Sequence, residues 1–184
     1  MASKIGKHPL LIGDQDIDGI RTIVLKKNNP NSHTGFTKLS EVLSLLPPGL
    51  VQKDETGMGA TTLELLAPRN SIIVEPIKIT ASSKAYKNTH NFGIPTLYVG
   101  SETKFHPKKP TRKEVLAYLN DPSIQYKKIM VVADSLKKVI AAIGPDVYKD
   151  YFLLLDEIDS FQMDSTYRRS MEECLDYYKL FELA

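Results

Sequence analysis

The sequence predicts an α/β domain of three layers, in which helices cover both faces of a mostly parallel central sheet. Short runs of aliphatic and β-branched residues recur along the chain with little polar alternation, as expected for strands that are covered on both faces. Stretches with apolar residues three and four positions apart separate several of these runs. Strands that alternate with helices favour right-handed crossovers and therefore a parallel sheet.

The composition is that of an ordinary globular protein. The chain has 184 residues, of which 42% are hydrophobic and 25% charged, enough for one domain with a sizeable core. Its net charge of +2 is too small to indicate a nucleic-acid or membrane partner by itself. The single cysteine, Cys174, excludes an internal disulfide, and no segment has the pattern of a signal peptide or a membrane span. We therefore expect a cytoplasmic protein with no membrane partner.

Residues 1–36 differ from the rest and are expected to form a partly irregular N-terminal extension. Residues 20–27 predict a short strand, and the polar stretch that follows them predicts a loop. The segment "DQDIDG" at 14–19 spells the first half of a calcium-binding loop. Its twelfth position is Leu25 rather than the glutamate that would bind calcium through both oxygens, so an exposed acidic turn is the favoured interpretation.

From residue 37 onward the pattern becomes regular, and we expect one domain over 37–184. Its first element is a short amphipathic helix over 37–46, which two prolines end. A strand at 50–54 leads into a loop with two glycines, and a helix over 61–66 follows. The later elements are strands at 71–76, 95–100, 128–135 and 151–157, and helices at 111–120, 134–144 and 166–183.

The loop "DETGMGATT" at 54–62 has the character of an anion-binding turn. Glycines let the backbone approach a phosphate, and N–H groups at a helix start attract negative charge. A phosphate-binding P-loop would read G-x-x-x-x-G-K-[ST]. Gly59 and Thr61 fit this pattern, whereas Asp54 replaces the first glycine and Ala60 replaces the lysine. When the loop is taken alone, a plain strand–turn–helix with a threonine cap is the favoured interpretation.

The segment "LLLDEIDSF" places Asp156 and Glu157 directly after an apolar strand. This is the Walker B arrangement, in which the first carboxylate holds the Mg²⁺ of a bound nucleotide and the second orients the attacking water. The alternative is a strand end followed by an acidic turn. Asp159 adds a third acid and favours a nearby cation.

Taken together, the two motifs resemble the first motor domain of helicases and translocases of superfamilies one and two. They occur in the family's order, about a hundred residues apart. "TGMGAT" at 56–61 corresponds to motif I, "SIIVEPIKITASSKAY" with Pro76 is similar to motif Ia, "KIMVVADSLKKVI" looks like a later strand and helix of the family, and "DEID" matches the DExD form of motif II. The resemblance covers residues 40–184.

The resemblance implies a RecA-like P-loop NTPase fold and an ATP-dependent helicase or translocase that binds ATP, Mg²⁺ and DNA or RNA. Because the chain ends about 25 residues after motif II, we expect a fragment of a longer protein with a second RecA-like domain, without which it does not hydrolyse ATP. The implied nucleotide-binding residues are Thr56, Gly57, Met58, Gly59, Ala60, Thr61 and Thr62, with Asp156 and Thr61 for Mg²⁺, Glu157 for catalysis, and Lys78, Ser82 and Lys84 for nucleic acid.

The chief departure from the family is Ala60 at the lysine position. Loss of one charge-assisted hydrogen bond lowers nucleotide affinity by roughly one to two orders of magnitude. Lys53, Lys78 or Lys84 would have to supply the missing cation. Two alternatives remain open: a catalytically inactive helicase-like domain that binds nucleic acid or protein, and an α/β domain in which the two motifs are coincidental.

Two further features have weaker implications. The segment "KFHPKKPTRK" at 104–113 carries five basic residues, which suit either a phosphate backbone or a solvated surface loop. The four histidines show no spacing typical of a metal site.

Overall fold

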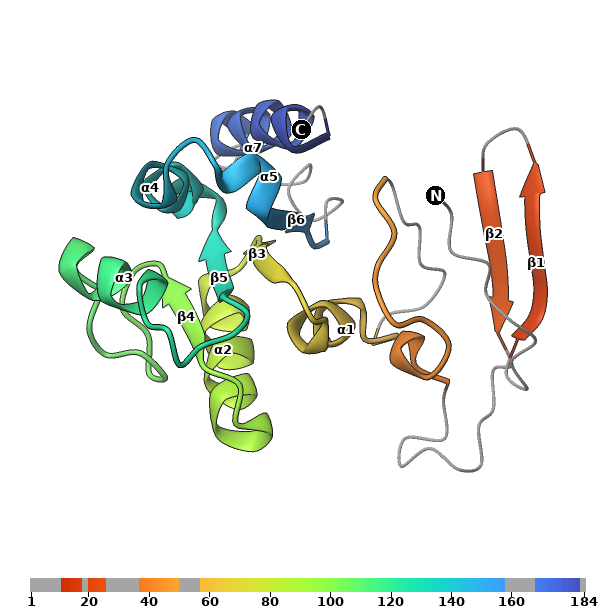
Figure 1. The fold of residues 1–184 in the computed structure, drawn as a ribbon, viewed down its shortest axis with the longest axis horizontal. Helices are drawn as coiled ribbons and strands as arrows, with labels where there is room; N and C mark the ends of the chain where they lie inside the picture. Colours follow the sequence, from red (N-terminus) through yellow and green to blue (C-terminus); the bar gives the residue numbers. More distant parts are fainter. Residues whose placement is uncertain (1–10, 18–19, 26–36, 50–56, 158–167, 183–184) are drawn as a thin grey trace. The chain divides into compact units, whose positions relative to one another are not determined.

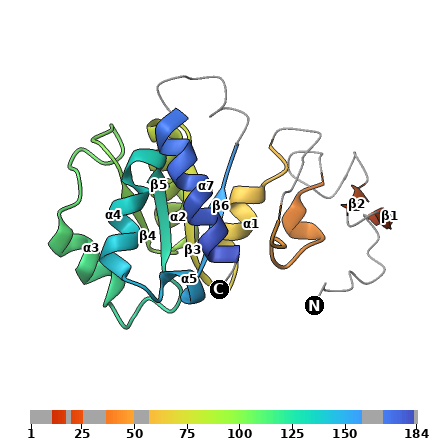
Figure 2. The same ribbon diagram turned by 90° about the horizontal axis from the view of Figure 1, so that it is seen from above.

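The computed structural model describes residues 11–17, 20–25, 37–49, 57–157 and 168–182 (Figures 1 and 2). The chain divides into two compact units, Met1–Ala67 and Pro68–Ala184, and each is described by itself.

A β-hairpin opens the first unit. Strand β1 (Leu11–Ile17) pairs antiparallel with β2 (Ile20–Leu25). The expected strand at 20–27 is therefore confirmed over 20–25, and residues 26–27 lie outside the described ones. Asp14 pairs with Ile23 in this ladder, so the residues expected to start an acidic turn or a calcium loop are part of a strand instead.

The prediction of an amphipathic helix over 37–46 is wrong. A single 3₁₀ turn, η1 (Leu39–Glu41), forms there. The backbone N–H of Leu39 donates to Met58 O at 2.9 Å, and the N–H of Lys38 donates to Oε2 of Glu41 at 2.5 Å. A helix this short is marginal in isolation, so such local contacts decide its conformation.

Helix α1 (Ala60–Leu66) confirms the helix expected over 61–66. The strand expected at 50–54 lies outside the described residues.

The second unit contains a four-stranded, all-parallel sheet in the order β4-β5-β3-β6. Ile72 of β3 lies opposite Ile129 of β5 on one side and Leu153 of β6 on the other. The strands are β3 (Asn70–Glu75), β4 (Thr96–Val99), β5 (Lys128–Val132) and β6 (Tyr151–Leu155).

The centre of this sheet consists mainly of buried apolar side chains. All five residues of β5 and the last five of β3 are buried, and the apolar runs at 72–74 and 129–132 form most of them. The side chains of Ile72, Val74, Ile129 and Val131 join one core cluster with residues of the covering helices. The predicted α/β fold class is thus confirmed.

Helices cover both faces of the sheet. On one face, α2 (Lys78–Phe92) contacts β3, β4 and β5. On the other face α4 (Ala133–Ile143) contacts β3 and β5 and is flanked by α3 (Arg112–Leu119) and α7 (Arg168–Glu182), as Figures 1 and 2 show. A short helix, α5 (Val147–Asp150), precedes β6.

The helices expected at 111–120, 134–144 and 166–183 are confirmed as α3, α4 and α7. Gly144 ends α4, as the sequence predicts.

The helix that follows β3 lies on one face of the sheet, whereas the helices that follow its two neighbouring strands lie on the other face. β3 is followed by α2 on one face, whereas β5 is followed by α4, and β6 along the chain by α7, on the other. In open parallel sheets, ligands bind outside the carboxyl ends of the strands at such a switch point. The topology therefore directs attention to the residues that end β3 and β6.

Candidate functional site

Two acidic side chains lie next to each other where β3 and β6 end. Glu75 is the last residue of β3 and is fully buried. Asp156 follows β6 and is 4% exposed. The backbone N–H of Asp156 donates to Val74 O at 3.0 Å, which continues the pairing of the two strands and fixes the carboxylate beside Glu75.

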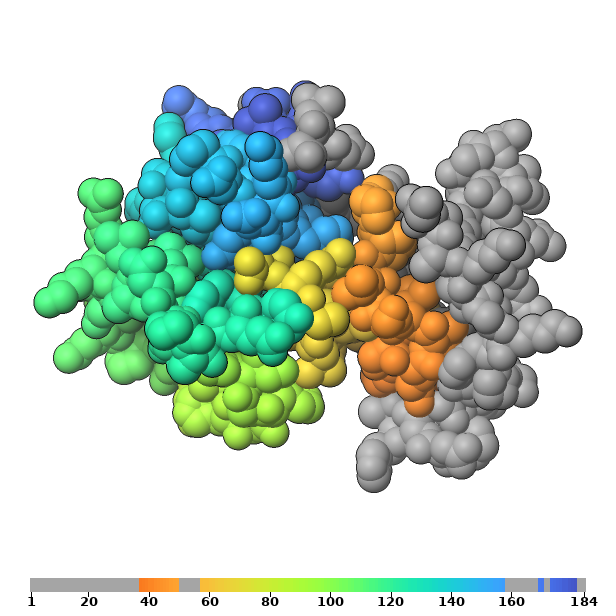
Figure 3. Space-filling model, viewed as in Figure 1, coloured from red at the N-terminus to blue at the C-terminus, as the bar shows by residue number. Residues whose placement is uncertain are grey.

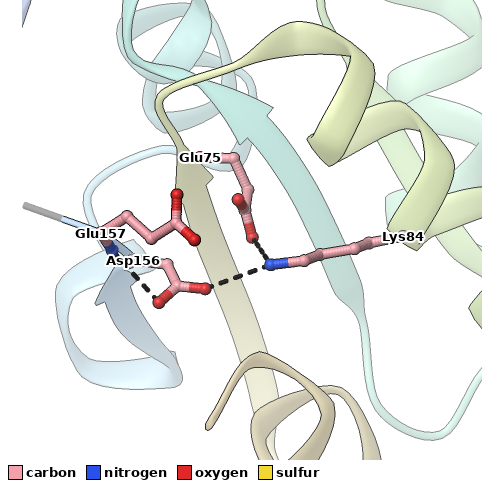
Figure 4. A network of polar contacts seen from close by, with 4 residues as sticks. All are labelled: Glu75, Lys84, Asp156 and Glu157. Carbon is pink, nitrogen blue, oxygen red and sulfur yellow. Dashed lines mark hydrogen bonds and ion pairs between the residues drawn. The ribbon is translucent and has the colours of Figure 1, made fainter. Parts of the chain in front are cut away.

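A lysine from α2 joins these two carboxylates (Figure 4). The Lys84 ammonium lies 2.6 Å from Oε1 of Glu75 and 3.2 Å from Oδ2 of Asp156. The other oxygen of Asp156 accepts a hydrogen bond of 3.1 Å from the N–H of Glu157. Helix α2 thereby reaches across the edge of the sheet and holds Asp156 in one orientation.

Burial governs the electrostatics of this cluster. It raises the pKa of Glu75 to about 7; attraction to Lys84 opposes this rise, and repulsion by Asp156 and Glu157 adds to it. Burial disfavours the charged form of Lys84, but attraction to Glu75 and Asp156 outweighs it and raises the pKa of the ammonium. The lysine therefore stays charged while Glu75 titrates near neutral pH.

Glu157, the expected catalytic residue, is exposed beside the buried pair. Its φ of 55° lies in the left-handed region, which costs a non-glycine residue roughly 1–2 kcal/mol. Backbone strain of this kind concentrates at functional sites. Figure 4 shows the carboxylate of Glu157 on the same side as those of Glu75 and Asp156. Asp159 lies outside the described residues.

The glycine loop belongs to the first unit. Gly57 and Gly59 have φ values of 77° and 84°, a conformation that glycine adopts without strain, and Gly59 is the N-cap of α1. Ala60 and Thr61 are buried, Met58 is half-buried, and Thr62 is exposed. Thr56 lies outside the described residues. Asp156 belongs to the second unit, and a joint site of this loop with Asp156 stays a prediction.

A cation does lie at the glycine loop, but it is none of those that the sequence suggested. The ammonium of Lys38 donates to Gly57 O at 2.9 Å. Lys53 lies outside the described residues, Lys78 is exposed at the start of α2, and Lys84 is bound to Glu75 and Asp156. Lys38 precedes the loop by 19 residues, so only the folded chain reveals this contact.

The three residues expected to bind nucleic acid lie in different surroundings. Lys78 is exposed, and Lys84 belongs to the acidic cluster. Ser82 is buried, and its hydroxyl is hydrogen-bonded to Thr103 and, at 2.8 Å, to Nδ1 of His106. Ser82 thus anchors the loop after β4 to α2.

A groove runs between α2 and this loop. Its volume is about 410 Å³, and it is lined by Ile79, Thr80, Ser83, Lys84, Lys87, Lys104 and Phe105. The ring of Phe105 lies 5.6 Å from that of Tyr86 and 5.1 Å from the ammonium of Lys104. Figure 3 shows the exposed part of α2 (yellow-green) at the surface. The basic segment 104–113 is recognisable in the sequence. The helix that it lies against, α2, was not predicted, so the groove between them was not expected.

The donor atoms of the cluster suit magnesium, which the family resemblance implies together with ATP. Mg²⁺ usually binds one or two carboxylates and completes its shell with water and phosphate oxygens. Asp156 provides one such carboxylate, and Oε2 of Glu75 is buried without a hydrogen-bond partner. Within the described residues, histidine, cysteine and acidic side chains form no metal-binding group of three or more. A magnesium ion at these carboxylates would therefore need water or phosphate oxygens as its remaining ligands.

Comparison with protein-family models, curated proteins and solved structures found no match to this chain. None of the helices in the described ranges combines the length and apolar character of a membrane span.

Proposed function

We propose that this chain is the first motor domain of an ATP-dependent helicase- or translocase-like protein. The observation that carries the proposal is the place of Asp156, which is buried at the carboxyl end of β6, beside the end of β3 and at the switch point of the sheet. The strained Glu157 follows it. An aspartate at this point suits the metal ion of a bound nucleotide, and the glutamate that follows it suits the positioning of a water.

Each residue then has a defined task. Asp156 would hold the Mg²⁺, and the ion when bound would neutralise phosphate charge. Glu157 would accept the proton of the attacking water or orient it. Backbone N–H groups of the loop at 57–59 would receive phosphate oxygens, with Thr61 as the second protein ligand of the ion. Complete catalysis would need a second RecA-like domain.

The groove beside α2 supports the nucleic-acid part of the proposal. Single strands bind where lysines track the phosphates and an aromatic ring stacks on a base. Lys87 and Lys104 are exposed in this groove, and Phe105 provides a ring. The partner would be DNA or RNA.

A second candidate is a catalytically inactive helicase-like domain that binds nucleic acid or protein. Two observations favour it: Ala60 replaces the lysine of the P-loop, and Asp156 already forms an ion pair with Lys84. Under this proposal the acidic cluster is a structural ion pair and the groove remains the functional surface.

Binding of a fluorescent ATP analogue with Mg²⁺ separates the two candidates. The motor proposal predicts binding at up to millimolar concentration that is lost in Asp156→Ala and kept in Asp146→Ala, a matched control with an exposed carboxylate. Absence of binding to the wild-type chain would favour the inactive module. Hydrolysis by the chain alone should be undetectable, and robust turnover would refute the need for a second domain.

A further inference from the structure

One buried atom of the acidic cluster has no partner. Oε2 of Glu75 is the one buried side-chain nitrogen or oxygen of the described residues that makes no hydrogen bond. The residue is fully buried, so bulk water does not solvate this oxygen. Buried polar atoms are nearly always paired, and a bound ion is one of the explanations for an exception.

The cluster already holds one cation between two carboxylates. The Lys84 ammonium is 2.6 Å from Glu75 and 3.2 Å from Asp156, so oxygens from two neighbouring strands converge on a single positive charge. Figure 4 shows the carboxylate of Glu157 turned toward the same space. The four residues drawn there are three acids and one base, so acidic groups outnumber basic ones in the cluster.

We propose that Glu75 and Asp156 bind a divalent cation directly, without nucleotide, at the place that the Lys84 ammonium occupies here. The cation and the ammonium would compete for the same oxygens, and Oε2 of Glu75 would become a ligand. Mg²⁺ and Mn²⁺ suit such a site, because they need only one or two carboxylates and take water for the rest. Glu75 is not among the ligands that the family resemblance implies, and the proposal does not depend on nucleotide binding.

The structure provides a place for the displaced ammonium. Lys84 is 30% exposed in its side chain, and it lines the groove beside α2. Rotation of its long side chain toward the groove would return the ammonium to water. Lys87 and Lys104 line the same groove, so an anion bound there would attract the released lysine and favour the exchange.

The test is a titration of the whole chain with Mn²⁺, with the free ion measured by electron paramagnetic resonance and no nucleotide present. Lys84→Met removes the competing ammonium and should tighten Mn²⁺ binding about tenfold or more, the equivalent of one charge-assisted hydrogen bond. Adding Glu75→Gln or Asp156→Asn to Lys84→Met should abolish this gain. Glu102→Gln, in an exposed loop, is the matched control and should leave it unchanged.

Equal Mn²⁺ affinity of the wild type and Lys84→Met, or a gain that survives Glu75→Gln, would overturn the proposal. If Lys84→Met fails to fold, the wild type alone still decides. A ligand that binds only the folded state raises stability, so Mn²⁺ should raise the unfolding temperature of the wild type but not that of Glu75→Gln. If Mn²⁺ binds in this way but the ATP analogue does not, the motor function fails and this site stands.

Discussion

The ammonium of Lys84 lies 2.6 Å from Oε1 of Glu75, and the two residues come from a helix and a strand that follow each other in the chain. The strand end is fully buried, whereas the lysine is partly exposed. The ion pair therefore places a charged carboxylate where water is excluded, which is costly even with a partner. The stability of the protein must therefore depend on whether Glu75 carries a proton.

The substitution Glu75→Gln should make the stability of the protein less sensitive to pH. Burial raises the pKa of Glu75 from 4.5 to about 7 in the folded protein. The folded state binds the proton of Glu75 more tightly than the unfolded state does. Protonated Glu75 therefore contributes stability to the fold that is fully present below pH 4.5 and is lost as the pH rises through 7. The advantage of Glu75→Gln over the wild type should grow by on the order of 3 kcal/mol across that window.

Urea denaturation at about pH 5 and about pH 8 measures this difference. Glu102→Gln serves as the control. Because Glu102 is exposed, its substitution should change the free energy of unfolding by the same amount at both pH values. A constant difference between Glu75→Gln and the wild type at the two pH values would show that Glu75 does not titrate between them.

Tyr118→Phe should destabilise the second unit by about 1–3 kcal/mol, the cost of leaving buried polar groups unsatisfied. The hydroxyl of Tyr118 accepts a hydrogen bond of 2.9 Å from the N–H of Lys128 and lies 2.9 Å from the carbonyl of the same residue and 3.0 Å from that of Pro95. It thus joins α3 to the starts of β4 and β5. Burial also raises the pKa of this phenol to about 12, so it stays a donor at neutral pH.

Tyr126→Phe is the matched control for this substitution. The hydroxyl of Tyr126 accepts a long hydrogen bond of 3.3 Å from Gln125, and the residue is 36% exposed. Its removal should change the free energy of unfolding by less than about 0.5 kcal/mol. Similar effects of the two substitutions would mean that the hydroxyl of Tyr118 does not join the helix to the sheet.

The central sheet could be predicted because its two central strands contain unbroken runs of buried apolar residues, at 72–74 in β3 and 129–132 in β5. Both faces of β3 and β5 are buried, so these runs show no alternation of apolar and polar residues. Helix α2 was missed because its buried face consists of small and polar residues, Ala81, Ser82, Ala85 and Asn88. Their helical spacing was a usable signal, but it does not appear in a search for large apolar residues.

The acidic cluster was only half predictable. Asp156 and Glu157 follow an apolar strand and form a recognisable motif, whereas nothing in the sequence around Glu75 marks it as a neighbour of Asp156. Its partner, Lys84, belongs to the helix that was missed. The contact of Lys38 with Gly57 depends on how a loop folds back on an earlier turn. Such pairs arise from tertiary structure, which local sequence patterns do not encode.

Lys87→Glu combined with Lys104→Glu, in the groove beside α2, should weaken binding of a single-stranded oligonucleotide. Fluorescence anisotropy over a range of salt concentrations should show a log–log salt slope smaller by about 0.7 for each phosphate that the protein no longer neutralises. Phe105→Ala should cost about 1–3 kcal/mol if a base stacks on the ring. The control reverses the charges of Lys137 and Lys138, which are exposed on α4. An equally large effect in that control would show that net charge, rather than the groove, attracts the strand.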